Sequence, residues 1–411
     1  MRHEKYKDSG VEWIGEVPAH WSLKKLKFIA DVTTGNRDTV DAVEGGIYPF
    51  FVRSDTIQQI DTFSFDGEGI FTAGDGDIGK IVHYFKGKCD FHQRVYCIYN
   101  SDINTKFLYY FFAEHFKIPA ELSNAKSTVN SIRMPVLNNF IVPIPSCEEQ
   151  DRIVDFLDDK TSKINSIIKE LESEKEKLEV YKRELIAEVV TKGLNSNIPM
   201  KDSGVDWIGQ VPEHWGIHPL FSVFKQNKVK NIGMENDNLL SLSYGNIIRK
   251  DIDTTFGLLP TNFENYQIVD KGYIILRLTD LQNDKKSLRT ALVNEKGIIT
   301  SAYIGLEKII SKCNTDYMHY LLHSYDLRKV FYSMGSGLRQ SLNFDDIKRL
   351  PIVLPKDDEQ KEIVEYLDYR VNKVESIKNK LQLQIEKLRD YRKIVIHEAV
   401  TGKVKIDGGA K

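Results

Sequence analysis

Residues 7–21 read KDSGVEWIGEVPAHW, and residues 201–215 read KDSGVDWIGQVPEHW. The two stretches differ only at Glu12/Asp206, Glu16/Gln210 and Ala19/Glu213. A match of this kind within one chain indicates an internal repeat, which has to be recognised before any single segment is interpreted. We call these two stretches the first arm and the second arm.

A second pair of matching segments follows the arms. One opens with IPSCEEQDRIVDFLDD at Ile144, and the other opens with LPKDDEQKEIVEYLDY at Leu354. The offset is 194 residues between the arms and 210 residues between these segments, so the block between them is 16 residues longer in the second half. The order along the chain is therefore arm, variable block and long helical segment, repeated once.

Both helical segments carry an apolar residue at every seventh position, with Lys and Glu between. Such a period over several heptads predicts a coiled coil. The expected interface positions are Leu157, Ile164, Leu171, Leu178 and Leu185 in the first segment and Leu367, Val374, Leu381, Leu388 and Val395 in the second.

A companion column three residues further on is imperfect. It holds Ile167, Tyr181, Ile377 and Tyr391, but also the polar residues Lys160, Glu174, Arg370 and Gln384. Two arrangements are open: the helices pack on each other, or each lies on its own block. Matched columns of matched length favour the pairing of the two helices.

The variable blocks, about 22–140 and 216–350, have a different pattern. They contain short β-branched and aromatic runs such as YPFFV, RVYCIYN and GYIILRL, separated by Gly, Asn and Asp. These are strand and turn signals. Near its end, each block has a helical stretch, TKFLYYFFAEHF or TDYMHYLLHSYDL. We therefore expect an α/β (α+β) fold with two mixed, β-rich globules and two long helices.

Composition limits the class of protein. The 57 Lys and Arg residues nearly balance 59 Asp and Glu, so the net charge of −2 gives no overall attraction to nucleic acid. The four cysteines are far apart and form no C-x-x-C pair, which argues against a zinc site or a disulfide framework and suggests a reducing cytoplasm. No apolar run reaches the roughly 18 residues of a membrane span, and the N-terminal residues do not resemble a signal peptide.

Several stretches resemble cofactor-binding or catalytic motifs, but each lacks a residue that the motif requires. GDGDIGK at 74–80 fits a P-loop until Ile81, where a Ser or Thr should bind Mg²⁺. FDGEG at 65–69 has the form of a methyltransferase cofactor loop, but the chain has no Pro-Pro for the companion motif. His20 and His214 have no nucleophile or base motif beside them, so we interpret them as structural. The sequence predicts no catalytic residues and no metal ligands.

The WIG-x-VP-x-HW arms, the IP/LP-x₃-EQ-x₂-IV helix openings and the repeated order of segments resemble the specificity subunits of type I restriction-modification systems. This resemblance implies that each variable block is a target recognition domain that reads one half of a bipartite, asymmetric DNA site. It implies that the two long helices form an antiparallel spacer that sets the gap between the half-sites.

The same resemblance implies partners for this chain. Two modification subunits would carry S-adenosylmethionine and methylate adenine N6, and two restriction subunits would supply ATP- and Mg²⁺-dependent translocation and cleavage. The chain itself would bind double-stranded DNA, hold no cofactor, catalyse no reaction and have no membrane contact. The alternative from another class is a duplicated coiled-coil scaffold that binds two protein partners.

These expectations give the following domains. Residues 1–145 hold the first arm and the first recognition domain, and 146–194 the first spacer helix. Residues 195–355 hold the second arm and the second recognition domain, 356–404 the second spacer helix, and 405–411 a tail.

Candidate DNA contacts are polar residues at strand ends and turns of the blocks. Arg, Lys and Gln can bind base edges, while Lys, Ser and Tyr can bind phosphates. The candidates are Arg53, Lys80, Gln93, Arg94, Lys126, Ser127 and Arg133 in the first block, and Arg277, Lys285, Lys286, Arg289, Ser301, Tyr303, Arg339 and Gln340 in the second.

Overall fold

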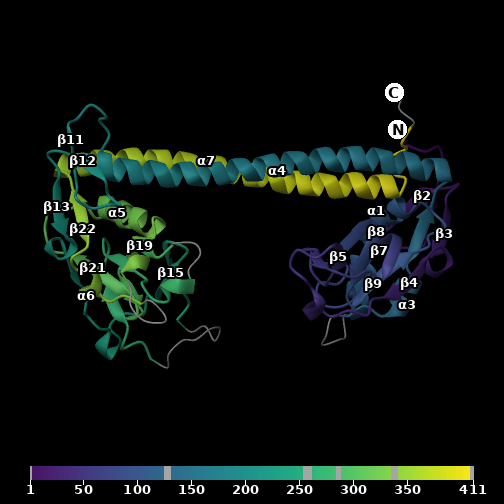
Figure 1. Cartoon of the computed structure of the whole chain (residues 1–411), viewed down its shortest axis with the longest axis horizontal. Helices are drawn as coiled ribbons and strands as arrows, with labels where there is room; N and C mark the ends of the chain where they lie inside the picture. The colour runs from purple at the N-terminus through teal and green to yellow at the C-terminus, as the bar shows by residue number, and fades with distance from the viewer. Residues whose placement is uncertain (1, 125–130, 253–261, 284–287, 335–340, 408–411) are drawn as a thin grey trace. The chain divides into compact units, whose positions relative to one another are not determined.

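The computed structural model describes residues 2–124, 131–252, 262–283, 288–334 and 341–407. The chain divides into two compact units, each with its own core (Figure 1). Unit 1 combines Met1–Glu172 with Gln382–Lys411, and unit 2 is Ser173–Leu381. The units differ from the consecutive domains expected from the sequence, because each long helix contributes one part to each unit.

Unit 1 is built on a mixed sheet with the strand order β4–β9–β7–β8–β5–β6. Its strands are β4 (Asp31–Thr34), β5 (Tyr48–Phe51), β6 (Gln58–Ile60), β7 (Phe65–Ala73), β8 (Val82–Phe91) and β9 (Val95–Tyr99). Neighbouring strands are antiparallel, except that β5 and β8 run parallel. Phe51 and Phe71 stack at 4.3 Å between ring centroids inside it. The aromatic runs of the first block are therefore core strands.

The helices of unit 1 are α1 (Thr105–His115), α2 (Lys117–Asn124) and α3 (Met134–Asn138). Helix α1 packs against strands β7 and β8 of the sheet and also contacts the first long helix, α4 (Cys147–Lys192) (Figure 1). Lys106 Nζ lies 2.6 Å from Asp158 Oδ2, and the Tyr110 hydroxyl donates to Asp158 Oδ1 at 2.7 Å. One carboxylate of α4 thus holds two side chains of α1.

Unit 2 contains a smaller antiparallel sheet of order β14–β21–β18–β19 and two antiparallel pairs, β15–β16 and β17–β20. The strands are β14 (Phe224–Gln226), β15 (Leu240–Ser243), β16 (Asn246–Arg249), β17 (Gln267–Val269), β18 (Ile274–Leu276), β19 (Thr290–Leu292), β20 (Gly297–Ile299) and β21 (Ile304–Lys308). Helices α5 (Thr315–Leu327) and α6 (Phe344–Ile347) precede the second long helix, α7 (Asp357–Val400). The two variable blocks therefore have different sheets.

The arms, in contrast, have the same structure in both units. Each forms a short antiparallel pair, followed by a strand that pairs with the end of the variable block. The pairs are β1 (Tyr6–Asp8) with β2 (Glu16–Pro18), β3 (Ser22–Lys25) with β10 (Ile141–Ile144), β11 (Met200–Asp202) with β12 (Gln210–Pro212), and β13 (Gly216–Pro219) with β22 (Pro351–Leu354). Gly15 and Gly209 adopt φ of +67° and +71°, a conformation that other residues rarely adopt, so this turn requires the repeated glycine.

The first turns of α4 and α7 hold the arms and the small helices in place through two adjacent side chains. Glu149 accepts a hydrogen bond from the Trp21 indole at 3.5 Å and contacts His20 Nε2 at 3.0 Å. Glu359 contacts Trp215 and His214 in the same way, at 3.2 and 2.9 Å. The two histidines therefore bind arm to helix, as the structural interpretation predicted.

The next residue of each helix binds the start of a small helix. Gln150 Oε1 accepts from Asn104 N at 2.8 Å, and Gln360 Oε1 accepts from Asn314 N at 2.7 Å. Each asparagine in turn accepts two backbone N–H groups at the start of α1 or α5, which caps that helix. The E-Q dipeptide of the repeat thus fixes the arm with Glu and the variable block with Gln.

Each arm tryptophan is covered on another side by a helix end that comes from elsewhere in the chain. Gly402, which follows α7, packs against Trp21 and Pro18, while Gly193, which follows α4, packs against Trp215. Both glycines have positive φ, and a Cβ on Gly402 would lie 2.5 Å from Pro18 Cδ. The C-terminal segment is therefore part of the core of unit 1.

Helices α4 and α7 pack on each other in antiparallel orientation within both units (Figure 1). In unit 1, Ile164 and Ile168 pack with Ile385. At the ends of the pair, Leu157 joins the core of unit 1 and Leu367 joins that of unit 2. All ten predicted interface residues are buried or half-buried. The preferred pairing is present, and the helix ends also lie on the blocks.

The companion column predicted from the sequence is wrong. Ile168 and Ile385, which lie four residues after Ile164 and Leu381, are 8% and 1% exposed. The predicted residues, three positions on, are exposed: Ile167, Tyr181, Ile377 and Tyr391. Positions i and i+4 of a helix share a face as closely as i and i+3, and only the partner helix decides which is covered.

In unit 2 the companion column is charged instead of apolar. Lys182 and Lys378 occupy it, and their stems are half-buried. Lys182 Nζ lies 2.7 Å from Glu375 Oε1, and Lys378 contacts both Glu179 and Glu375. The two halves of the helix pair therefore use different interactions at equivalent positions.

Among the helices of the described residues, none combines the length and the apolar composition that a membrane-spanning segment requires.

Replacing Ile168 with Asp should destabilise unit 1 by about 3–5 kcal/mol, because it leaves an unpaired carboxylate in an apolar contact. Replacing the exposed neighbour Ile167 with Asp should change the free energy of unfolding by less than about 1 kcal/mol. Urea denaturation of both variants measures the difference. Equal effects would contradict the assignment of the companion column.

Candidate nucleic-acid interface

Two predicted arginines of unit 1 converge on one carboxylate. Arg53, after β5, donates through Nη1 to both oxygens of Asp75 at 3.0 and 3.2 Å. Arg94, before β9, donates to Asp75 Oδ2 at 3.0 Å. Asp75 is 13% exposed, whereas the arginine side chains are 43% and 63% exposed. A half-buried acid therefore orients two guanidinium groups that still reach solvent.

Other predicted residues lie on loops next to this cluster. Gln93 donates to Asp38 at 2.9 Å, and Lys80 forms an exposed ion pair with Asp77 on the β7–β8 connection. Arg133 is exposed at the start of α3, two residues from Ser131, which bridges to Asp75. The loops that carry the first block's described candidates thus meet around Asp75.

Sequence analysis missed two residues that support these loops. Arg37 pairs with the buried carboxylate of Asp90 at 3.2 Å. His92 accepts the Arg94 backbone N–H at 2.9 Å, and burial, with the nearby Arg53, lowers the pKa of His92 below its usual value. A neutral imidazole can accept that hydrogen bond. The polar run HQR between two strands was the only signal for it.

The two rejected motifs are elements of this sheet. FDGEG lies inside β7 and pairs with β8, so it is a strand and not a cofactor loop. GDGDIGK connects the antiparallel strands β7 and β8, with Gly76 and Gly79 at positive φ. A P-loop would join a strand to a helix. The structure therefore agrees with the interpretation as a turn.

In unit 2, three described candidates are accessible to different extents. Arg277 is exposed directly after β18, and Ser301 is exposed while its hydroxyl donates to the Asn265 carbonyl. Tyr303 is half-buried against the apolar cluster of β15, β18 and β20. Unlike Arg53 and Arg94, which share Asp75, these three side chains contact no common residue in the described part of unit 2. Their role as DNA contacts stays a prediction.

Arg289 does not fit the predicted role. Its side chain is 7% exposed, and it donates to the carbonyls of Arg277, Thr279 and Asp280 at 3.1, 2.5 and 3.0 Å. These contacts hold the chain that follows β18. Because its guanidinium is buried and already bound to backbone oxygens, Arg289 is a structural residue and leaves the set of candidates.

Six candidates lie outside the described residues and are not placed. They are Lys126 and Ser127 in the first block, and Lys285, Lys286, Arg339 and Gln340 in the second.

Unit 2 also contains a hollow, lined by both polar and apolar side chains, that the sequence did not predict. It measures about 710 Å³ and lies between the helix pair and the β15–β16 hairpin, with Tyr244 and Asn246 from the hairpin and Lys182 from α4 on its walls. His319 and His323 of α5 line it as well. Burial lowers the pKa of His323 to about 4, so this histidine is neutral near pH 7.

Arg289 and Arg277 offer a direct test of the revised assignment. Arg289→Ala should lower the free energy of unfolding by about 1–3 kcal/mol, because three carbonyls lose a charged donor. Arg277→Ala should change it by no more than about 0.5 kcal/mol, since that side chain is exposed. Thermal and urea unfolding measure both. A stable Arg289→Ala variant would show that the buried contacts are dispensable.

Comparison with known proteins adds evidence that the geometry alone does not give. The family model described as "Type I restriction modification DNA specificity domain" matches residues 18–177 and again residues 228–387. The first match begins within the first arm and the second begins after the second arm; each includes most of a variable block and extends into a long helix. Together they cover more than half of the chain.

Curated relatives match over nearly the full length. The chain is 23% identical to the type I restriction enzyme EcoDI specificity subunit of Escherichia coli, over 95% of this chain and 90% of that protein. It is 25% identical to the putative type I restriction enzyme MjaX specificity subunit of Methanocaldococcus jannaschii, over 96% of each. Both names denote specificity subunits, in line with the prediction that this chain is not the catalytic one.

One solved structure shares the fold. Its description reads "Structural basis underlying complex assembly and conformational transition of the type I R-M system", and it aligns with this chain at a TM-score of 0.67. The identity is 14%, over 94% of this chain and 99% of that chain. The likeness confirms the predicted fold class of two mixed, β-rich domains with two long helices.

Proposed function

This chain belongs to the type I restriction-modification DNA specificity family, and we propose that each of its variable blocks reads one half of a bipartite, asymmetric DNA site. The observation that carries the proposal is the double match of one DNA specificity domain, once in each half of the chain. The arms are nearly identical, while the sheets of the two blocks differ. Two different variable blocks, each held by the same repeated arm and helix, suit a DNA site with two different halves.

Within unit 1, the Arg53–Asp75–Arg94 cluster is the part of the surface that supports DNA reading best. Two arginines can bind guanine edges or neighbouring phosphates, and both are already oriented by a shared carboxylate. Such orientation lowers the entropy lost when a flexible side chain binds. Gln93 and Arg133 on adjacent loops extend the same surface.

The two long helices are the proposed determinant of the gap between half-sites. Helix α4 has 46 residues and α7 has 44, and a helix rises about 1.5 Å per residue. Within each unit the two helices pair in antiparallel orientation, through contacts such as Ile168–Ile385 in unit 1 and Lys182–Glu375 in unit 2, and this pairing supports the proposal.

The proposal also includes partner subunits. Modification subunits would bring S-adenosylmethionine and methylate adenine N6, and restriction subunits would bring ATP- and Mg²⁺-dependent cleavage. This chain would recognise the DNA target site for the complex, which would act in the cytoplasm. Support comes from the family match and from curated relatives named as specificity subunits of restriction enzymes. Adenine methylation in a duplex requires base flipping, which a separate reader can assist by holding the site.

Exchanging residues 22–140 for the corresponding block of another family member tests this division of function. We expect one methylated half-site to change, while the other half-site and the gap persist, because unit 2 and the helices are untouched. Methylome sequencing of cells that carry the complete system gives the readout. Unchanged methylation would favour the alternative of a scaffold for protein partners, and a change in both half-sites would favour one continuous reading surface.

At the residue level, Arg94→Ala should weaken binding of the assembled system to its DNA by about 1–3 kcal/mol if Arg94 reads a base edge. If Arg94 binds a phosphate instead, binding should weaken for all DNA sequences. The slope of log affinity against log salt concentration should then become smaller by about one, because one ion fewer is released on binding. Lys24→Ala, which removes an exposed charge of β3 that is not a candidate contact, is the matched charge control. Affinity measured against salt for both variants decides, and an Arg94→Ala variant that binds like the wild type would remove the cluster from the interface.

A further inference from the structure

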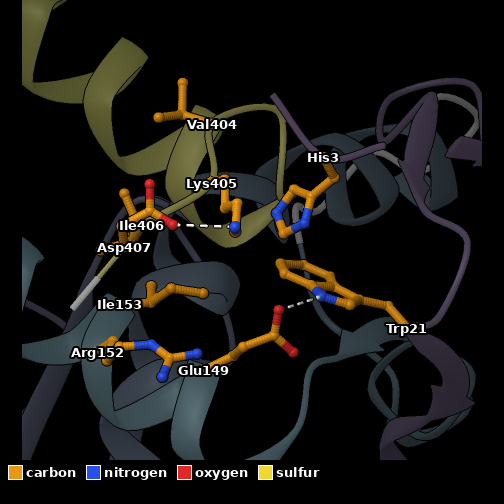
Figure 2. Close-up of a pocket in the computed structure, with 9 residues that line it drawn as sticks. All are labelled: His3, Trp21, Glu149, Arg152, Ile153, Val404, Lys405, Ile406 and Asp407. Atoms are coloured by element: carbon orange, nitrogen blue, oxygen red, sulfur yellow. Dashed lines mark hydrogen bonds and ion pairs between the residues drawn. The ribbon is translucent and has the colours of Figure 1, made fainter. Parts of the chain in front are cut away.

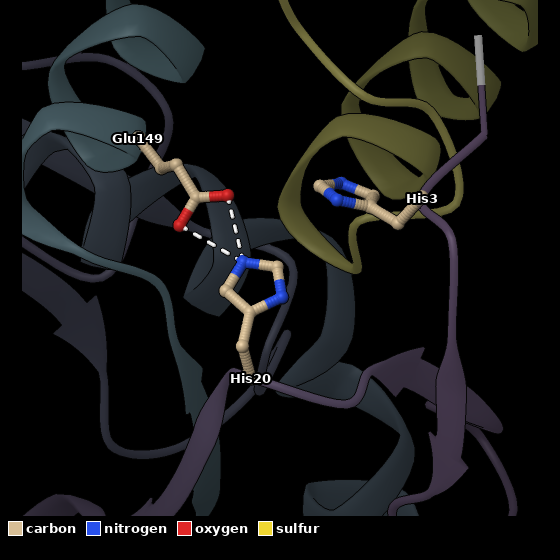
Figure 3. Close-up of side chains that lie close together, drawn as sticks. All are labelled: His3, His20 and Glu149. Carbon is tan, nitrogen blue, oxygen red and sulfur yellow. Dashed lines mark hydrogen bonds and ion pairs between the residues drawn. The ribbon is translucent and has the colours of Figure 1, made fainter.

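Three side chains with metal-binding atoms converge in unit 1 from three separate segments. His3 belongs to the N-terminal stretch, His20 to the first arm and Glu149 to the first turn of α4 (Figure 3). One ligand atom of each lies within 4.8 Å of the other two. His20 Nε2 is already 3.0 and 3.2 Å from the two oxygens of Glu149.

Two of the three side chains, His3 and Glu149, line a partly open hollow, while the His20 side chain beside it is 55% exposed. The hollow measures about 230 Å³ (Figure 2). It is lined by the apolar residues Trp21, Ile153, Val404 and Ile406 and by the charged residues Arg152, Lys405 and Asp407. In Figure 2 the His3 ring faces the hollow from the side opposite Glu149.

The main chain at His3 is held in place. Its backbone N–H donates to the Tyr6 hydroxyl at 3.1 Å, and that hydroxyl donates to the Gly402 carbonyl at 3.1 Å. His3 is therefore fixed to the arm and to the segment after α7, so that only its side chain needs to turn to meet the other two.

The repeat within the chain shows which part of this cluster the frame itself requires. In unit 2, His214, Trp215 and Glu359 reproduce the contacts of His20, Trp21 and Glu149. The residue at the arm offset from His3 is Asn197, which is exposed, and the described residues of unit 2 hold no third ligand of this kind. Two residues thus suffice to bind arm to helix, and His3 adds something that this contact does not need.

We propose that His3, His20 and Glu149 form a binding site for a divalent transition metal, specifically Zn²⁺, with water as the fourth ligand. Two imidazoles and one carboxylate are a ligand set that Zn²⁺ accepts. Zn–N and Zn–O bonds of about 2.0–2.2 Å place tetrahedral ligand atoms about 3.3 Å apart. The His20–Glu149 contact of 3.0 Å is already close to that spacing, and rotation of His3 would bring in the third ligand.

Two cations near the hollow each have a carboxylate partner. Lys405 Nζ lies 3.1 Å from Asp407 Oδ1, as Figure 2 shows, and Arg152 Nη1 lies 4.0 Å from Glu148 Oε2. Their charge is therefore partly compensated by groups other than the three ligands. A bound ion would connect the N-terminal stretch directly to the start of α4, and through Tyr6 to the end of α7, all within unit 1.

Metal titration of the untagged, full-length chain after removal of metals with a chelator tests the proposal. We expect one Zn²⁺ per chain by calorimetry, one Co²⁺ with the visible absorption of a tetrahedral site, and displacement of Co²⁺ by Zn²⁺. His3→Asn should weaken Zn²⁺ binding at least about tenfold, because even the loss of an outer partner of a metal ligand commonly costs that much. His3 is peripheral, so this variant should fold normally.

The repeat provides the matched control. His214→Asn alters the equivalent contact of unit 2 and should leave both the stoichiometry and the Zn²⁺ affinity unchanged. Zn²⁺ should also raise the thermal midpoint of the wild-type chain and of His214→Asn, but not that of His3→Asn. Absence of stoichiometric binding by the wild type, or equal affinity in wild type and His3→Asn, would overturn the assignment.

Discussion

Two adjacent side chains at the start of each long helix connect every part of a unit. The glutamate binds the arm through His and Trp, and the following glutamine binds the start of the small helix of the variable block. In unit 1, burial alone would raise the pKa of Glu149, but hydrogen bonds from His20 and Ser146 hold it at about 2. The carboxylate therefore stays charged, and a charged acceptor forms stronger hydrogen bonds than a neutral one.

This arrangement explains why the frame is repeated nearly unchanged while the blocks differ. Glu, Gln, His, Trp and the turn glycines each make a specific contact, so few substitutions preserve it. The blocks need only an asparagine cap and an apolar face to attach to the same frame, as Asn104 and Asn314 show. The loops that we propose to read DNA can therefore diverge on a constant support.

The units are completed by segments distant in sequence. Unit 1 needs the last part of α7 and Gly402 to cover Trp21, and unit 2 needs the last part of α4 and Gly193 to cover Trp215. Within the helix pair, Ile168 of unit 1 has Lys378 of unit 2 as its counterpart. An apolar contact is insensitive to salt, whereas a partly exposed ion network is weakened by it, so the contacts at these two equivalent positions should respond differently to ionic strength.

The sequence by itself determined the repeat, the two long helices, the heptad column and the β-rich character of the blocks, because periodicity and turn residues are local properties. The family resemblance rested on the same local motifs. Only the tertiary structure decided which neighbours meet across space. It placed Ile168 and not Ile167 on the partner helix, turned Arg289 inward onto three carbonyls, and brought Arg53 and Arg94 to one carboxylate. It also placed His3 beside His20 and Glu149, residues 17 and 146 positions further along the chain. Burial and coordination depend on contacts between distant segments, and no single stretch of sequence encodes them.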